Sequence, residues 1–301
     1  RAARRAAPGR HALPRRMSDD TRAEALAAAL TGLDAWPVPH AAAVVVGPDG
    51  VLAARGDTAT ARPIASVTKP LTAAVVLLAA DDGLVDLDEP VGPTAARGAT
   101  VRHLLAHAAG LGFEAGDRTM TPGLRRVYSN WGYEVLGDLV AAREGRPFAD
   151  VLRDRLTGPL GMAATVLDGS PAWGARASTA DLGRFVRELL APRVLPPSAR
   201  SGLTTVAFPD LDGVLPGFGR QRPNPWTLGL ELRAAKEPHW GGPLPPDAVG
   251  HFGRSGSLVW AAPPLGLGLA TLSGRDFDAW AAEGWPALAA AVLAAGAGLS
   301  G

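Results

Sequence analysis

The sequence predicts an α/β (α+β) fold, in which an antiparallel sheet is flanked by helices and assembled from both ends of the chain. Strand-like segments occur near the N-terminus and again in the last third, and the segments between them have the apolar periodicity of helices. A chain that runs from strands through helices and back to strands segregates its sheet from its helices. We therefore expect a mostly helical subdomain inserted into a sheet subdomain.

The predicted domain organisation follows from this order. At 301 residues, 47% of them hydrophobic, the chain can form one large domain with a sizeable core. We assign 17–82 and 200–301 to the sheet subdomain and 83–199 to the helical subdomain. Residues 1–16 carry six arginines and no acidic residue, and they lack the apolar core of a secretory signal. They are predicted to be a disordered or non-native leader, with a mitochondrial-type presequence or a functional basic tail as alternatives.

The first predicted elements are a helix and a β-hairpin. Residues 22–35 have the pattern of an amphipathic helix. The run 41–47 is continuously apolar, 48–50 is a Pro-Asp-Gly turn and 51–56 returns as a second strand, so the first strand of this hairpin is expected to be buried. A further helix should follow Pro63 and end near Gly83.

The remaining predicted elements are helices followed by strands. Thr100 is expected to cap a short helix over 101–107, and Ser178 or Thr179 to cap a helix that ends at Leu190. Two more helices are predicted at 132–146 and 148–155. The last third is predicted to form strands at 226–232, 257–262 and 265–273, with a final helix at 279–294.

Composition excludes several classes of function. Without residues 1–16, the chain has 24 basic and 29 acidic residues, a net charge of −5, so we expect no nucleic-acid partner. No run of about 18 apolar residues predicts a membrane span. The absence of cysteine excludes disulfides and thiol chemistry, and we expect no metal and no cofactor. His103 and His107 lack the glutamate of a zinc-protease pattern and are interpreted as packing or capping residues. The missing secretory signal favours the cytoplasm.

Ser66 and Lys69 are the first candidate catalytic pair. They lie one helical turn apart, at the start of a predicted helix whose N–H groups and dipole stabilise negative charge. Only two of the 30 basic residues are lysines, and a buried lysine can release its proton whereas arginine cannot. Lys69 could therefore deprotonate Ser66 for attack on a carbonyl. The structural alternative is an N-cap serine beside a solvated lysine.

Tyr128 and Asn130 form a second candidate motif, in a loop just before a predicted helix. A phenol beside a lysine ammonium is expected to have a lowered pKa and to act as a base toward a serine hydroxyl. Asn130 offers an amide donor and an acceptor to the substrate, and the adjacent Trp131 could line the cleft. The structural alternative is a packed tyrosine followed by a helix-capping asparagine.

His251 and Gly253 form the third candidate motif. Glycine lets a substrate approach the backbone closely, and a histidine could bind a substrate carboxylate or transfer protons. His239-Trp-Gly241 is a second match to the same short pattern. We favour His251 because it directly precedes the closing strands, whereas His239 lies among prolines and glycines in a predicted surface loop.

Together, the three motifs resemble the serine β-lactamase and penicillin-binding-protein superfamily, in its branch of class C β-lactamases, D-alanyl-D-alanine carboxypeptidases, D-aminopeptidases and family VIII esterases. They occur in the order Ser66-x-x-Lys69, Tyr128-x-Asn130 and His251-x-Gly253. Residues 100–111 also resemble the branch's T-x-R-H-L-L-x-H-x-S-G-L segment, and 128–133 its Y-S-N-x-G-Y segment. The resemblance implies a β-lactamase/transpeptidase-like fold from about residue 40 to 295, as one catalytic domain.

The resemblance also implies roles for these residues. Ser66 would be the acylated nucleophile, Lys69 and Tyr128 would share the acid and base work, and Asn130 would orient the substrate. His251 would stand where many members have the lysine of a Lys-Thr-Gly motif, binding a carboxylate or tuning Tyr128. The oxyanion hole would be the backbone N–H groups of Ser66 and Arg254. A histidine at this place is common in esterase and peptidase members, which disfavours a dedicated β-lactamase.

The sequence therefore predicts a serine hydrolase that forms an acyl-enzyme at Ser66. Its expected substrate is a small cytoplasmic ester or amide, with acyl transfer to another acceptor as a variant of the same chemistry. The alternative is a non-catalytic binding or regulatory protein on the same fold. Ser66, Lys69 and Tyr128 together disfavour that alternative, because a protein without catalysis has no chemical need for all three.

Overall fold

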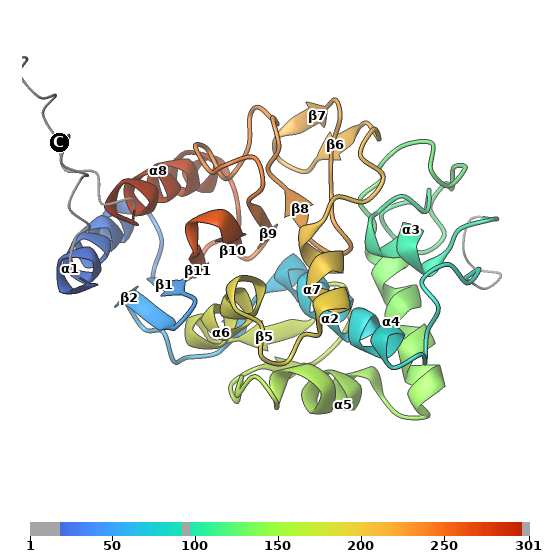
Figure 1. Ribbon diagram of the computed structural model, residues 1–301. Helices are drawn as coiled ribbons and strands as arrows, with labels where there is room; N and C mark the ends of the chain where they lie inside the picture. The colour runs from blue at the N-terminus through green and yellow to red at the C-terminus, as the bar shows by residue number, and fades with distance from the viewer. Residues whose placement is uncertain (1–18, 92–96, 297–301) are drawn as a thin grey trace, which may run out of the picture.

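A six-stranded antiparallel sheet joins the two ends of the chain in the computed structural model, which describes residues 19–91 and 97–296 (Figure 1). Its strand order is β2-β1-β11-β10-β9-β8, so the N-terminal hairpin pairs with the C-terminal strands, as predicted. The strands are β1 (Ala41–Gly47), β2 (Gly50–Arg55), β8 (Glu231–Leu232), β9 (Val249–Gly253), β10 (Ser257–Ala262) and β11 (Leu267–Ser273). The predicted leader, 1–16, lies outside the described residues.

Helices cover both faces of this sheet. α1 (Asp19–Ala29) and α8 (Ala279–Gly296) pack together on one face, and α6 (Thr179–Leu190) packs against β1, β10 and β11 on the other (Figure 1). Alternate residues of β1 accordingly enter two cores, Ala43 and Val45 on the α8 side and Val44 and Val46 on the α6 side. Because both faces are covered, β1 is apolar at consecutive positions.

The central helix of the second part of the molecule is α2 (Thr68–Asp81). It packs against α4 (Asn130–Glu144), α5 (Phe148–Leu152) and α7 (Pro197–Thr204), and most of its side chains are buried. α3 (Val101–Leu105) packs on α4 and begins at Thr100, whose side chain accepts a hydrogen bond from the His103 N–H, as predicted. A helix that is apolar on all sides must be surrounded by other elements. The turn that leads into α2 contacts β9 and β10, so the N-terminus of α2 lies where the helices meet the sheet.

Short elements complete the fold. Strands β3 (Arg62–Pro63), β5 (Ala175–Ala177) and β4 (Val166–Leu167) form a three-stranded sheet, and β6 (Gly213–Leu215) pairs with β7 (Gly219–Gln221) in a hairpin. 3₁₀ turns occur at Leu30–Ala35, Ala65–Val67 and Pro263–Leu265, and a π-helical turn at Arg153–Thr157. Neither α7 nor the β6–β7 hairpin was predicted from the sequence, because both are short and rich in Gly, Pro or Ser.

One predicted strand differs from the structure. The strand predicted at 226–232 is reduced to Glu231–Leu232, because Gly229 has φ 127° and interrupts the extended chain. The division into subdomains at residues 82 and 199 stays a prediction. α6, inside the predicted helical segment, covers the sheet, and α2, inside the predicted sheet segment, is surrounded by helices. The N-cap predicted at Ser178 is confirmed by its hydrogen bond from the Asp181 N–H.

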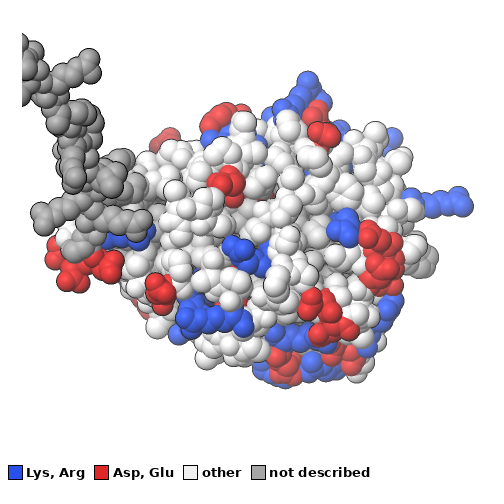
Figure 2. Space-filling view, in the orientation of Figure 1, with Lys and Arg blue, Asp and Glu red and all other residues white. Residues whose placement is uncertain are grey.

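Charged side chains of both signs are interspersed on the face shown in Figure 2. Many form arginine–carboxylate pairs, such as those of Arg153 with Asp150 and Asp154 near α5. Such exposed pairs contribute little stability each. Within residues 19–91 and 97–296, no helix has the length and apolar character that crossing a bilayer requires.

Candidate active site

Ser66 lies in the 3₁₀ turn Ala65–Val67, which leads directly into α2. The residue before it, Ala65, has φ 45°, a left-handed conformation that is unfavourable for a residue with a Cβ. Thr68 supports this turn, because its hydroxyl donates to Ala65 O at 2.7 Å. The turn presents the half-buried Ser66 side chain to a cavity at the N-terminus of α2, which is the location that the sequence predicted.

Lys69 follows one helical turn after Ser66, and its side chain is completely buried. Its Nζ donates to Asn130 Oδ1 at 2.7 Å and to the Ala172 carbonyl oxygen at 3.0 Å. The third contact of Nζ is with Ser66 Oγ, at 3.3 Å. The predicted pair is therefore brought together, and two fixed acceptors hold the amine in place.

Burial lowers the pKa of Lys69 from 10.5 to about 7, although Glu114 and Glu134 act in the opposite direction. Much of the amine is therefore neutral at neutral pH, and a neutral amine has two N–H bonds and one lone pair. The two short contacts of Nζ take the N–H bonds, which leaves the lone pair facing Ser66 Oγ. This arrangement lets the Ser66 hydroxyl give its proton to Lys69.

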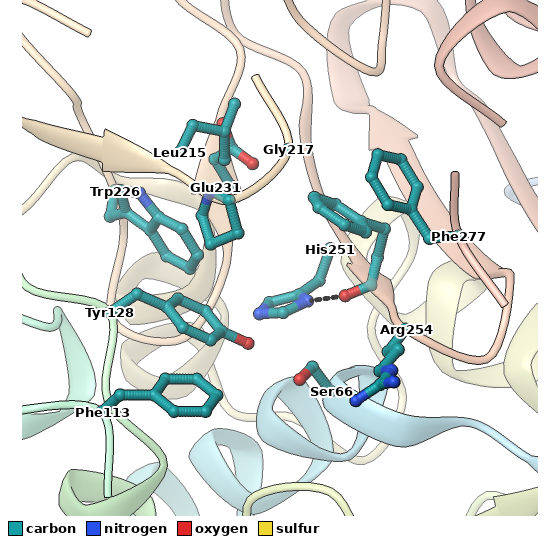
Figure 3. Close-up of a pocket in the computed structure, with 12 residues that line it drawn as sticks. Ser66, Phe113, Tyr128, Leu215, Gly217, Trp226, Glu231, His251, Arg254 and Phe277 are labelled. Atoms are coloured by element: carbon teal, nitrogen blue, oxygen red, sulfur yellow. Dashed lines mark hydrogen bonds between the residues drawn. The ribbon is translucent and has the colours of Figure 1, made fainter. Parts of the chain in front are cut away.

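Tyr128 lies just before α4, and its hydroxyl points toward Ser66 across the cavity (Figure 3). Burial raises the pKa of Tyr128, and its hydrogen bond with Ser66 offsets this only in part. The prediction that Lys69 lowers this pKa is wrong. Lys69 Nζ faces the ring, 4.7 Å from its centroid, and the removal of the phenol from water dominates. Tyr128 is therefore a protonated phenol at neutral pH.

Aromatic and imidazole rings surround Tyr128. The ring centroids of His107, Trp226 and His251 lie 4.5, 5.9 and 5.9 Å from that of Tyr128. His107 also accepts a hydrogen bond from the Ser129 N–H at 3.2 Å, through Nδ1. His107 is thus a packing residue, as predicted, and it belongs to the support of the site. These contacts fix the direction of the Tyr128 hydroxyl.

Asn130 is the first residue of α4, and both ends of its amide are engaged. Its Oδ1 accepts from Lys69, and its Nδ2 donates to Glu114 Oε1 at 2.8 Å. Glu114 comes from the loop after α3, and the sequence analysis did not identify it. Trp131, which was predicted to line the cleft, packs against the helical core instead. The reason is geometric, because consecutive helical residues point about 100° apart and Asn130 already faces the site.

His251 lies in β9 and is buried beside Tyr128. Its Nδ1 lies 2.8 Å from the Phe252 carbonyl oxygen, which can only accept, so Nδ1 carries the proton. Nε2 is then an acceptor. It is buried without a hydrogen-bond partner and lies on the side of the Tyr128 hydroxyl (Figure 3).

Burial and the neighbouring Lys69 affect the charge of His251. Burial, and to a lesser extent Lys69, lower the pKa of His251 to about 3. The imidazole is therefore neutral at neutral pH, which favours, of the predicted roles, proton transfer and tuning of Tyr128 over binding of a substrate carboxylate. A neutral His251 can still accept a proton or a hydrogen bond through Nε2.

Gly253 ends β9 against the turn that carries Ser66. A Cβ at this position would lie 2.3 Å from the Ile64 carbonyl oxygen and 2.4 Å from Ser257 Oγ, so only glycine permits the approach. Ser257 Oγ donates to the same Ile64 oxygen at 2.6 Å, which ties β10 to the turn. The end of β9 therefore lies beside Ser66, as an oxyanion hole between the N–H groups of Ser66 and Arg254 requires.

Arg254 follows at the edge of the cavity. Its side chain is 86% exposed and pairs with Asp276, with 3.2 Å between Nε and Oδ2. In Figure 3 the guanidinium lies to one side of Ser66, away from Tyr128 and Trp226. The backbone of Arg254 is thus close to the reacting serine, while its charge is largely in solvent.

The cavity above Ser66 has a volume of about 230 Å³ and is mostly apolar. Figure 3 shows that aromatic rings form its walls and that the Ser66 and Tyr128 hydroxyls point into it from the same end. Its lining residues are Ser66, Phe113, Tyr128, Leu215, Pro216, Gly217, Trp226, Glu231, His251, Phe252, Arg254 and Phe277.

A buried polar cluster behind the Trp226 wall was missed by the sequence analysis. Glu231 Oε1 accepts from Lys236 Nζ at 2.8 Å and from His239 Nε2 at 3.0 Å, and Oε2 accepts from Trp240 Nε1 at 2.6 Å. Burial disfavours ionisation of Glu231, but Lys236 and His239 outweigh it and lower the pKa to about 2. His239 is fully buried, so its prediction as a surface-loop residue is wrong.

This cluster explains the second of the two lysines. Lys236 is buried, its Nζ lies 5.7 Å from the centroid of the Trp226 ring, and Trp226 in turn contacts Tyr128 and His251. Both lysines of the chain are thus within or directly behind the site. The rarity of lysine was a usable signal for Lys236, whereas Glu231 gave none. Among the described residues, no group of three or more His, Cys, Asp and Glu side chains could hold a metal ion.

Comparison with known proteins gives one family and several relatives. A family model described as Beta-lactamase matches residues 35–294. A curated relative, the D-alanyl-D-alanine-carboxypeptidase/endopeptidase AmpH of Escherichia coli (strain K12), is 27% identical over 154 residues. That match covers 40% of this chain and 40% of the relative, so the chain matches less than half of that protein's length.

Two solved structures have the same fold over most of the chain. A crystal structure of a beta-lactamase (Mb2281c) from Mycobacterium bovis is 48% identical, with a TM-score of 0.85, and the match covers 88% of this chain and 98% of the other. EstCE1, described as a hydrolase with promiscuous acyltransferase activity, is 16% identical with a TM-score of 0.73, over 91% and 99% of the two chains. At that identity, the second likeness shows the fold alone.

Proposed function

Because the chain belongs to the Beta-lactamase family, we propose that it is a serine hydrolase that forms an acyl-enzyme at Ser66 and cleaves a small ester or amide. The observation that carries the proposal is the contact of 3.3 Å between Lys69 Nζ and Ser66 Oγ, made by a completely buried lysine whose pKa is lowered to about 7. A serine hydroxyl is a weak nucleophile until a neighbouring base removes its proton.

Acylation begins with transfer of the Ser66 proton to the neutral amine of Lys69. Ser66 Oγ then forms a bond to the substrate carbonyl carbon, and the oxyanion that results faces the backbone N–H groups of Ser66 and Arg254. Each such donor contributes about 10²- to 10³-fold to the rate of related reactions. The N-terminus of α2 adds a favourable dipole at the same place.

Collapse of this intermediate breaks the bond to the leaving group, which needs a proton. Tyr128 is the suitable donor, because burial keeps its phenol protonated and its hydroxyl points toward Ser66. The Lys69 ammonium then returns a proton to Tyr128, so the protein regains its starting charge. Deacylation repeats these steps with water as the nucleophile, and an alcohol or amine in place of water gives acyl transfer.

Asn130 and His251 act on the geometry of this reaction. Asn130 holds Lys69 through Oδ1, and Glu114 fixes which end of the amide faces the lysine. The neutral His251 offers Nε2 as an acceptor beside the Tyr128 hydroxyl and orients it during proton transfer. The relatives include a beta-lactamase and a D-alanyl-D-alanine-carboxypeptidase/endopeptidase, which agrees with one acyl-enzyme chemistry on different substrates.

The test is covalent labelling of the full chain. Incubation with 4-nitrophenyl acetate or a fluorophosphonate should add one acyl or phosphonyl group, mapped to Ser66 by intact mass and peptide analysis. Ser66→Ala should remove both the adduct and turnover. The matched control is Ser255→Ala, because Ser255 lies two residues after Gly253 and its hydroxyl donates to Ser257 Oγ at 3.3 Å, not to a group in the proposed mechanism. Turnover by Ser66→Ala at the wild-type rate would refute the assignment and favour a binding protein.

A further inference from the structure

We propose that the cavity above Ser66 selects uncharged substrates with an apolar group of about the size of a phenyl ring next to the reacting carbonyl, and that Gly217 and Phe277 close its far end. This inference rests on the proposed function, because it places the reacting carbonyl at Ser66. It goes further by naming the chemistry of the substrate and the part of this chain that limits its size.

The walls of the cavity are mostly apolar. Phe113, Trp226 and Phe252 contribute ring surface, and the Phe113 and Tyr128 rings are stacked with centroids 6.2 Å apart. Leu215 adds an aliphatic side chain at the end opposite Ser66 (Figure 3). A cavity lined in this way gains free energy from apolar surface and offers few hydrogen bonds to a polar ligand.

The charged side chains around the cavity disfavour a substrate carboxylate. Of its lining residues, only His251 and Arg254 have basic side chains. His251 is neutral at neutral pH because burial lowers its pKa to about 3, and Arg254 is 86% exposed and paired with Asp276. Glu231, also in the lining, is ionised. A substrate carboxylate would therefore lose its water without gaining a cation, which is unfavourable in an apolar site.

Lys69 does not supply the missing cation for a substrate carboxylate. Its Nζ already contacts Ser66 Oγ, Asn130 Oδ1 and the Ala172 carbonyl oxygen, and its side chain is completely buried. A carboxylate in the cavity would have to displace one of these acceptors. The site therefore disfavours a negatively charged substrate, and an uncharged ester fits it better than a substrate that carries a free carboxylate.

The far end of the cavity sets the size limit. The turn of the β6–β7 hairpin is closed by a hydrogen bond from the Phe218 N–H to Leu215 O at 3.0 Å. A Cβ on Gly217 would lie 2.5 and 2.7 Å from two ring carbons of Phe277, so the turn and the ring are in direct contact. Behind it, Phe277 packs against Phe252 and Trp285, with centroids 5.0 and 5.3 Å apart.

The volume agrees with one ring. An apolar protein cavity of roughly 150 Å³ is known to hold a benzene molecule. The cavity here has about 230 Å³, which leaves room for a ring and a short linker to the carbonyl at Ser66. A second ring in line with the first would meet the hairpin turn and Phe277.

The substrate series is designed to separate size, charge and position. Methyl acetate is the reference, methyl 3-phenylpropanoate places the ring on the acyl side, and 2-phenylethyl acetate places it on the alcohol side. Dimethyl adipate and monomethyl adipate have the same chain and differ in one charge. We expect at least one phenyl ester to exceed methyl acetate in kcat/KM by about 10- to 100-fold. Dimethyl adipate should exceed its monoester at least 10-fold. Equal rates in either comparison would overturn the inference.

The variant pair tests the far wall. Phe277→Ala should lower the ratio of kcat/KM for the better phenyl ester over that for methyl acetate by about 10-fold, because the ring loses its contact surface. Phe218→Ala is the matched control, since Phe218 packs on the Phe252 and Phe277 rings without lining the cavity. It should keep the wild-type ratio. The same loss of ratio in both variants would mean that Phe277 acts through packing alone and would overturn its assigned role.

A binding measurement separates this inference from the proposed function. Ser66→Ala is titrated by calorimetry with 4-phenyl-2-butanone, an uncharged ketone, and with 5-oxohexanoate, a ketone that carries a carboxylate. The phenyl ketone should bind at least 10-fold more tightly. If esters are cleaved at Ser66 but show no preference, the proposed function stands and this inference fails. If no ester is cleaved, the proposed function fails, and the ketone titration alone supports or refutes the cavity's specificity.

Discussion

The proton equilibrium of Lys69 gives the sharpest prediction. Its amine must be neutral to accept the Ser66 proton, and burial lowers the pKa of Lys69 to about 7. We therefore expect kcat/KM for ester hydrolysis to rise with pH through a midpoint near 7 and to level off above pH 8. A lysine with an ordinary pKa of 10.5 would instead give a rate that still rises tenfold per pH unit between 7 and 9.

The same shift has a consequence for stability, and its sign follows from proton linkage. Below pH 7, Lys69 is charged in both the folded and the unfolded protein, and the folded state carries the full cost of burying that charge. Between pH 7 and 10.5 the folded protein has lost the proton and the unfolded chain still holds it, so the free energy of unfolding rises with pH. The full shift of 3.5 units corresponds to roughly 5 kcal/mol, of which roughly 2 kcal/mol falls between pH 7 and pH 9.

Urea unfolding of the wild type and of Lys69→Met at pH 6, 7, 8 and 9 measures this contribution of Lys69 to the free energy of unfolding. Lys236 is present in both proteins, so its own titration largely cancels in the difference. The wild type should gain about 2 kcal/mol relative to Lys69→Met between pH 7 and pH 9. Parallel stability curves, together with a rate that still rises tenfold per pH unit between pH 7 and pH 9, would show that the pKa of Lys69 is not lowered. A rate that does not change between pH 6 and pH 8 would refute the role of Lys69 as the base.

Three further substitutions test the supports of the site. Tyr128→Phe removes the proton donor and should lower kcat/KM about 10²- to 10⁴-fold; an unchanged rate with esters of poor leaving groups would mean that Lys69 works alone. Gly253→Ala should lower kcat/KM about 10²-fold with the fold retained, because its Cβ would lie 2.3 Å from the Ile64 oxygen and displace the Ser66 turn. Wild-type turnover would show that this approach is not needed. Lys236→Met should cost about 3–5 kcal/mol in urea unfolding, because it leaves the buried Glu231 without its cation. A loss that persists when Glu231→Gln is added would argue for packing rather than charge.

Local signals were sufficient for several elements of the fold. The β1–β2 hairpin, β10, the caps at Thr100 and Ser178 and the closing helix α8 follow from apolar runs, turn residues and capping side chains that act within a few positions. The strand predicted at 226–232 failed because pairing is decided by a neighbouring strand. Only Glu231–Leu232 meets β9, and Gly229 turns the chain away before that point.

The candidate catalytic residues were also identified from the sequence, because their chemistry is visible in residue type and spacing. Ser66 and Lys69 need only one helical turn to meet, and the rarity of lysine marked Lys69. The same signal was available for Lys236 and was not used. Neither residue type nor spacing identified Glu114 and Glu231 as part of the site. Each reaches the site from a separate segment, Glu114 through Asn130 and Glu231 beneath Trp226, and a sequence does not state which distant segments meet.

Residue types and their spacing were enough to show which groups could take part in catalysis, whereas the protonation states of these groups depend on the fold. The pKa predicted for Tyr128 was wrong because it was inferred from one charged neighbour, Lys69. Burial raises the pKa of Tyr128, lowers that of His251 to about 3 and lowers that of Lys69 to about 7. Loss of hydration depends on what the whole fold packs around a group, and it outweighs single charged neighbours at these three positions.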